Sequence, residues 1–100
     1  MTKQDVLRRI TQQTGIDPQL SLSIVESFFE VVKEAVSDGE TIYIRSFGSF
    51  GPKQRARKLG RNISANTALV IEAHIIPRFK PSAEFVHQVR LLKTSGSQQE

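Results

Sequence analysis

The segment from Pro18 to Ser37 predicts a helix that is apolar over more of its surface than a small monomer can cover. Asp17 can cap its first turn, Pro18 suits its first helical position, and Gly39 follows its end. At about 100° per residue, the apolar side chains span an arc of roughly 200°. They are Leu20, Leu22, Ile24, Val25, Phe28, Phe29, Val31, Val32, Ala35 and Val36. A helix on the surface of a monomer needs a stripe of little more than about 100°, so this helix needs cover from two directions.

A chain of 100 residues forms one domain and offers little else to provide that cover. The arc therefore predicts a subunit partner, with Phe28 and Phe29 in the dimer core. A homodimer meets this need, and so does a heterodimer with a related chain.

The rest of the pattern predicts a helix before this one and strands after it. Thr2 and Asp5 resemble a capping box, apolar residues follow at helical spacing, and Gly15 ends that segment. Residues 41–45 are rich in β-formers and predict a strand, while the glycines of 47–51 permit a tight turn or bulge.

Residues 52–66 contain almost no apolar side chain and cannot form core. An extended apolar pattern resumes over 69–76, and residues 81–92 predict a short final helix. Two extended segments that flank a polar insert predict a hairpin whose far end leaves the body of the protein. The fold class is therefore α+β.

Positive charge is concentrated in that hairpin. Residues 53–80 hold seven basic side chains against one acidic residue, Glu72, which gives +6, whereas the other 72 residues hold 7 basic and 9 acidic ones. Such asymmetry indicates a polyanionic partner. Lys53, Arg55 and Arg57 alternate, so in one strand all three project from one face.

Lys58 and Arg61 extend the cation toward the tip, and each of these side chains can neutralise a phosphate without sequence preference. No aromatic residue is interleaved among them. Single-stranded nucleic acid is usually held by stacking on aromatic side chains, so duplex DNA is favoured as the partner.

Catalysis and cofactors find little support in the sequence. His74 and His87 are the only histidines and there is no cysteine, so no metal site is predicted and His74 is interpreted as a strand surface residue. The polar amino terminus lacks the apolar region of a signal peptide, and no run of about eighteen apolar residues exists. We expect a cytoplasmic protein that is no enzyme and binds no cofactor.

Three motifs in order resemble the landmarks of the HU/integration-host-factor family. They are Phe47-Gly48-Ser49-Phe50, Gly60-Arg61-Asn62 and Pro77-Arg78-Phe79-Lys80-Pro81, and the resemblance covers residues 1–92. It implies an intertwined dimer with two helices at the amino terminus, a three-stranded antiparallel sheet, a long protruding β-arm and a short carboxyl-terminal helix. The arms of such proteins reach around DNA along the minor groove. The implied domain is 1–93 with the arm at about 52–76, followed by a disordered polar tail at 94–100.

The resemblance also implies roles for single residues. Matches to arm positions that contact DNA are Lys53, Arg55, Lys58, Arg61 and Asn62. Basic positions near the DNA-facing side of the body are matched by Lys3, Arg78 and Lys80. Core phenylalanines of the dimer are matched by Phe47, Phe50 and Phe79.

The chain departs from the family pattern at three places. Ile63 stands where the family usually has a proline wedged between base pairs, and isoleucine is another side chain that inserts between base steps. Asn66 replaces a common glycine of the tip turn, and it tolerates the left-handed conformation better than other residues with a side chain. Ser82-Ala83-Glu84 replaces a segment that often carries more lysine.

Together these features predict a dimeric architectural protein that binds and bends duplex DNA, largely without sequence preference, and condenses DNA in a bacterial nucleoid. One alternative is a site-specific DNA-bending factor that reads deformability rather than bases. The other is a cationic interaction module that binds RNA or an acidic protein.

Overall fold

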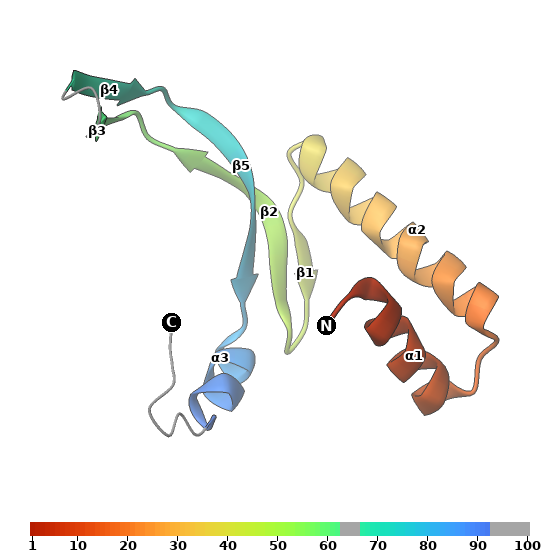
Figure 1. The fold of residues 1–100 in the computed structure, drawn as a ribbon. Coiled ribbons are helices and arrows are strands. Elements are labelled where there is room, and N and C mark those ends of the chain that lie inside the picture. The colour runs from red at the N-terminus through yellow and green to blue at the C-terminus, as the bar shows by residue number, and fades with distance from the viewer. Residues whose placement is uncertain (63–66, 93–100) are drawn as a thin grey trace. The chain divides into compact units, whose positions relative to one another are not determined.

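A computed structural model describes residues 1–62 and 67–92 (Figure 1). Its elements, in chain order, are α1 (Lys3–Thr14), α2 (Pro18–Ser37), β1 (Ile42–Ile44), β2 (Gly48–Arg55), β3 (Lys58–Asn62), β4 (Thr67–Ile71), β5 (His74–Pro81) and α3 (Ala83–Arg90). This order confirms the predicted α+β class. The chain divides into two compact units, Met1–Ala35 and Val36–Glu100, and each is described by itself.

The helices of the first unit begin where the sequence provides caps. The Asp5 carboxylate accepts hydrogen bonds from the backbone N–H of Thr2 at 2.9 Å and from its hydroxyl at 3.2 Å. Arg8 donates to the same carboxylate at 2.9 Å. The backbone N–H of Thr2 contributes most, ahead of Arg8 and then the Thr2 hydroxyl, to holding the pKa of Asp5 below its usual range. Gly15 closes α1 with a left-handed φ of 73°.

The boundaries predicted for α2 are confirmed at both ends. The Asp17 carboxylate accepts from the backbone N–H of Gln19 at 3.0 Å and of Leu20 at 3.1 Å, so it caps the first turn. Gly39, with φ of 87°, donates its N–H to the carbonyl of Val36 at 3.0 Å just beyond the helix end.

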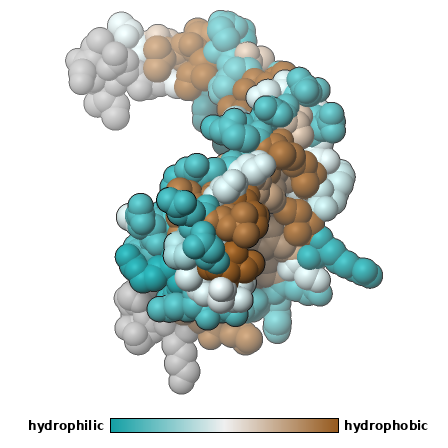
Figure 2. Space-filling model, turned by 90° about the vertical axis from the view of Figure 1, so that its right-hand side faces the viewer, coloured by the Kyte–Doolittle hydropathy of each residue, from teal (hydrophilic) through white to brown (hydrophobic). Residues whose placement is uncertain are grey.

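Apolar side chains of the single chain remain in contact with solvent. Within the described residues no apolar side chain is buried, and Ser21 is the one polar side chain that is. Phe28 and Phe29 are 43% and 44% exposed, and apolar surface is visible in the space-filling view (Figure 2). One copy of the chain therefore leaves its most apolar helix face without cover.

In the second unit β1, β2 and β5 form a three-stranded antiparallel sheet in the order β1-β2-β5. The chain turns between β1 and β2 at Ser46, whose φ is 66°, so the predicted tight turn precedes the glycines. Gly48 follows with φ of 157°, and a Cβ there would lie 2.5 Å from the carbonyl oxygen of Lys80. The close approach of β5 to β2 at this point therefore requires glycine.

Four phenylalanine rings gather at the base of this unit. Phe79 lies 4.9 Å from Phe50 and 5.2 Å from Phe47, measured between ring centroids. Phe85, from α3, stacks on Phe47 at 5.4 Å. The sequence identified the first three as core residues. It predicted the short final helix but did not join Phe85 to the cluster.

The arm is a hairpin built from two ladders. β2 pairs with β5 through Arg55 and His74, and β3 pairs with β4 beyond them (Figure 1). Residues 56–57 and 72–73 separate the two ladders, two residues on each side, so the register is the same before and after the interruption.

The prediction of one strand carrying Lys53, Arg55 and Arg57 is wrong in its extent, because β2 ends at Arg55. Ala56 and Ala73 oppose each other in the continued register, and alanine gives a ladder little cross-strand packing. The predicted tail at 94–100, Ile63 and Asn66 lie outside the described residues.

Candidate nucleic-acid interface

The β2–β5 ladder gathers four cations on one face. Residues directly opposite each other in an antiparallel pair share a face, and residues two apart in a strand share it too. Arg55 lies opposite His74, Arg78 opposite Gly51, and Lys80 opposite Ser49. The cationic face therefore comprises Lys53, Arg55, Arg78 and Lys80, all of them exposed.

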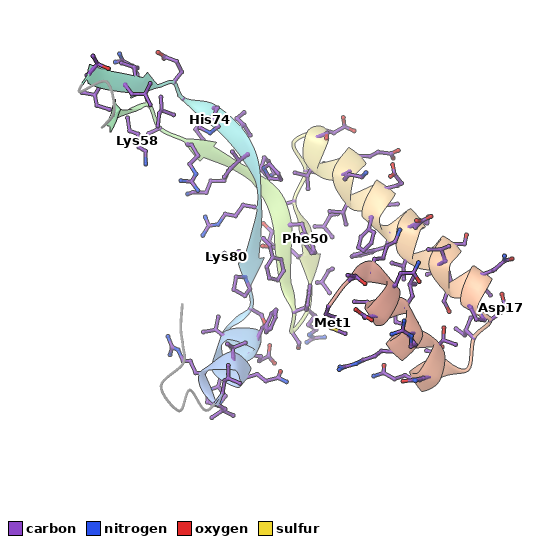
Figure 3. All side chains as sticks on the ribbon, in the orientation of Figure 1. Met1, Asp17, Phe50, Lys58, His74 and Lys80 are labelled. Carbon is purple, nitrogen blue, oxygen red and sulfur yellow. The ribbon has the colours of Figure 1, made fainter. Side chains whose placement is uncertain are left out.

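The other face of the same ladder is apolar. Phe50 lies opposite Phe79, and Pro52 lies opposite Pro77. The aromatic rings pack in the cluster at the base, which fixes this face toward the body of the unit. Strand alternation thus turns the cations away from the aromatic cluster, and Lys80 and Phe50 illustrate the two directions (Figure 3).

A shallow pocket lies within the cationic face. Its lining residues are Thr41, Ser49, Gly51, Pro52, Lys53, Arg78 and Lys80. A Cβ on Gly51 would lie 2.5 Å from the Thr41 hydroxyl oxygen, so glycine makes room for that hydroxyl across β2. Three cations and two hydroxyl groups around one hollow are donors suited to a phosphate group.

Tyr43 is a residue of this face that the sequence reasoning missed. It lies opposite Ser49, which lies opposite Lys80, so one residue from each strand forms a row across the sheet. The Tyr43 side chain is 80% exposed. Its place between Ile42 and Ile44 was a signal in the sequence, because alternation in a strand puts it on the face opposite to both isoleucines.

The outer ladder carries the remaining predicted arm residues. Lys58 is exposed and lies opposite Ile71 in the β3–β4 ladder (Figure 3). Arg61 and Asn62 end β3, where they pair with Ala68 and Thr67. Ile63, the predicted wedge, lies outside the described residues, so its role stays a prediction.

Two predicted cations already have acidic partners. The Nε of Arg57 lies 3.7 Å from Oε1 of Glu72 at the interruption between the ladders. Lys3 belongs to the helical unit, where its Nζ lies 2.6 Å from Oε2 of Glu26. Both pairs are exposed, so each is weak and can exchange its anion.

The cationic face offers ligands for phosphate groups. His74 is exposed on β5, and its Nδ1 lies 2.9 Å from the carbonyl oxygen of Glu72. Over residues 1–62 and 67–92, no three histidine or acidic side chains are grouped as metal ligands. No helix of that same part is long and apolar enough to cross a membrane.

Comparisons with known proteins agree with this geometry. Residues 1–90 match the family described as bacterial DNA-binding protein. The chain is 36% identical over 78 residues to the DNA-binding protein HU of Lactococcus lactis, a match that covers 78% of this chain and 86% of the relative. It is also 36% identical over 90 residues to the integration host factor subunit beta of Marinobacter nauticus, covering 89% and 92%.

Solved structures give the same result at the level of the fold. The structure of Anabaena HU crystallised with DNA matches with a TM-score of 0.82 and 25% identity over 92% of this chain and 100% of that one. HU from Thermotoga maritima matches with a TM-score of 0.63 and 22% identity, covering 89% and 98%.

Proposed function

Because the chain belongs to the family of bacterial DNA-binding proteins that contains HU and the integration host factor subunits, we propose that it binds duplex DNA as a dimer and bends it. The observation that carries this function is the cationic face of the β2–β5 ladder. Beyond that ladder, β3 and β4 continue the arm as a protruding hairpin. Phosphates contacted along such a ribbon supply affinity without sequence preference.

The cationic face forms the inner part of the interface. Lys53, Arg78 and Lys80 surround the pocket over Gly51 and bind backbone phosphates near the body, while Arg55 binds farther out. Along the outer arm, contacts come from Arg57, Lys58, Arg61, Asn62 and, as a wedge between base steps, Ile63. Lys3 adds a phosphate contact from the helical unit when it exchanges Glu26 for DNA.

The dimer follows from the uncovered apolar surface. Phe28 and Phe29 of α2 are more than two-fifths exposed in one chain. Complete burial of such a side chain contributes roughly 1.5–3 kcal/mol, so covering the part that is still exposed contributes roughly 1 kcal/mol each. A second copy covers them and completes the core that contains Phe47, Phe50 and Phe79. Two copies also present two arms, as a protein that bends DNA from both sides requires.

The role that fits is architectural. The protein holds DNA in a bent form in the bacterial nucleoid and needs no cofactor, and its donors bind phosphates rather than transform a substrate. The proposal accordingly places it in the cytoplasm, without an enzymatic activity.

Binding to linear duplexes of unrelated sequence, at several salt concentrations, tests this function. The logarithm of the affinity should fall against the logarithm of the salt concentration with a slope steeper than about −4, because several phosphates release their counterions. Fluorescence transfer between labelled DNA ends should report bending. RNA or polyglutamate that displaces the protein as well as duplex DNA does would refute duplex recognition.

A site-specific bending factor is a second candidate. It is favoured by the 36% identity to an integration host factor subunit, which equals the identity to HU. Sequence-dependent stiffness would then distinguish sites that the protein never contacts through bases. Affinities that differ by more than about a hundredfold between unrelated duplexes in the same assay would support it.

A further inference from the structure

Glu72 is the one acidic residue between positions 53 and 80, and it lies at the interruption between the two ladders of the arm. The constant register places it opposite Arg57. The distance from Arg57 Nε to Glu72 Oε1 is 3.7 Å, and the two side chains are 63% and 77% exposed. The only carboxylate of the cationic arm therefore forms an ion pair with one particular arginine, Arg57.

Among the described residues, the Glu72 carboxylate pairs with Arg57 and takes no part in the contact that His74 makes with the backbone. The backbone here is held by a contact that does not involve the carboxylate, since His74 Nδ1 lies 2.9 Å from the Glu72 carbonyl oxygen. An exposed pair of this kind contributes little to the stability of the fold. Its larger effect is electrostatic, because the carboxylate offers Arg57 the same kind of oxygen ligand that a phosphate offers.

We propose that Glu72 limits the affinity of the arm by competing with DNA phosphates for Arg57. The inference rests on the proposed function, since it concerns the strength of DNA binding. When DNA arrives, Arg57 exchanges one anion for another, and the freed carboxylate remains beside the phosphates. Both effects reduce the gain from the Arg57 contact. Because Glu72 partly offsets the charge of Arg57, the arginine neutralises its phosphate less fully and fewer of the counterions condensed on the DNA are released. Glu72 thereby favours release from DNA over permanent occupancy.

The test is a double-mutant cycle on DNA binding. Glu72→Gln keeps the size and polarity of the side chain and removes its charge. The matched control is Glu40→Gln, an exposed glutamate between α2 and β1. Glu72→Gln should tighten binding about three- to tenfold in the dimer, and steepen the logarithmic salt slope by up to about one per arm. Glu40→Gln should change the affinity less than twofold.

The cycle is completed by Arg57→Gln alone and together with Glu72→Gln. Loss of Arg57 should weaken binding severalfold more when Glu72 is absent than when it is present. If Glu72→Gln tightens binding equally with and without Arg57, Glu72 acts through its general field and the competition is refuted. Unchanged affinity of Glu72→Gln refutes it as well.

Two further results separate the explanations. Glu72→Lys should bind DNA more tightly than Glu72→Gln while its thermal unfolding stays near that of the wild type, whereas a structural role for Glu72 would lower the unfolding temperature of both variants. If the wild type and Glu40→Gln fail to bind duplex DNA at all, the proposed function falls and this proposal falls with it. Normal wild-type binding with no change in the cycle overturns this proposal alone.

Discussion

Helix α2 and the arm both expose side chains that a solitary folded chain would not need to expose, but the two sets are of opposite chemical kind. Phe28, Phe29 and their neighbours on α2 present carbon to solvent. The cationic face presents Lys53, Arg55, Arg78 and Lys80. Exposed apolar surface is buried when another protein surface covers it, whereas separated cations are neutralised when a polyanion binds.

From this difference we expect assembly and DNA binding to use separate surfaces of this short chain. In the β2–β5 ladder they meet back to back, because alternate residues point to the aromatic cluster and to the cationic face. Substitutions on one side should therefore affect stability and spare the phosphates, and substitutions on the other should do the reverse. Four experiments test this separation.

The largest effect is expected from Phe29→Asp. A carboxylate in the surface that a second copy covers would cost several kcal/mol, because a buried charge without a partner is strongly penalised. Sedimentation should show a wild-type dimer and an unfolded or aggregating variant. Ser23→Asp, which adds the same charge to the polar side of α2, should remain dimeric. A folded wild-type monomer at micromolar concentration would contradict the dimer.

Gly48→Ala tests the joint between β2 and β5. The added Cβ would meet the Lys80 carbonyl oxygen at 2.5 Å and the Phe79 ring at 2.7 Å, at a φ of 157° that disfavours any side chain. We expect a loss of about 2–4 kcal/mol of unfolding free energy in chemical denaturation. Gly39→Ala has a positive φ but nothing within 4 Å, so it should lose only about 1–2 kcal/mol. Equal losses would show that backbone conformation alone, without the close approach of β5, sets the cost.

Replacing Arg55 and Lys58 together by alanine tests the arm. Duplex affinity should fall about ten- to a hundredfold on every sequence, the salt slope should become shallower, and the unfolding midpoint should stay unchanged. The matched control removes Arg8 and Lys33, which pair with Asp5 at 2.9 Å and with Glu30 at 3.1 Å in the helices. That variant should bind nearly as the wild type does. A loss confined to one DNA sequence would instead indicate base readout.

The smallest effect is expected from lowering the pH, which protonates the Asp5 carboxylate. The pKa of Asp5 is held below its usual range, chiefly by the backbone N–H of Thr2. A carboxyl whose pKa is lower in the folded state stabilises that state above its unfolded pKa, and the contribution is lost as pH falls through the folded pKa. Amide signals of Thr2 and the first turn of α1 should therefore shift only as the pH falls below 3.8, the usual pKa of an aspartate carboxyl. In Asp5→Asn this titration should be absent, and amide signals of the β2–β5 ladder should not follow it in either protein.

Local chemistry made much of the fold predictable. Asp17 and Gly39 marked the ends of α2 because caps act over one turn. Alternation and charge located the arm and the cations that line it. The pairing of Arg57 with Glu72 could not be predicted, because the residues are far apart in sequence and meet only through the pairing register of the two ladders.

The same limit applies to the site. Phe85 joins the aromatic cluster because α3 follows β5 directly, and Tyr43 joins the cationic face through the row with Ser49 and Lys80. Both required knowledge of which strands are neighbours. The end of β2 at Arg55 coincides with Ala56 and Ala73, which oppose each other in the continued register, and the pattern of either strand alone does not reveal that pair.

The unchanged register across the interruption has a consequence for how arms of this kind can differ in length. Removing one residue from each strand would preserve the pairing but turn Lys58 and everything beyond it to the opposite face. Only removal or addition in twos keeps the outer side chains where they are. Arm length is thus quantised in steps of roughly 6.6 Å, close to the rise of two base pairs at about 3.4 Å each. Designed arms that grip longer or shorter stretches of duplex should follow that increment.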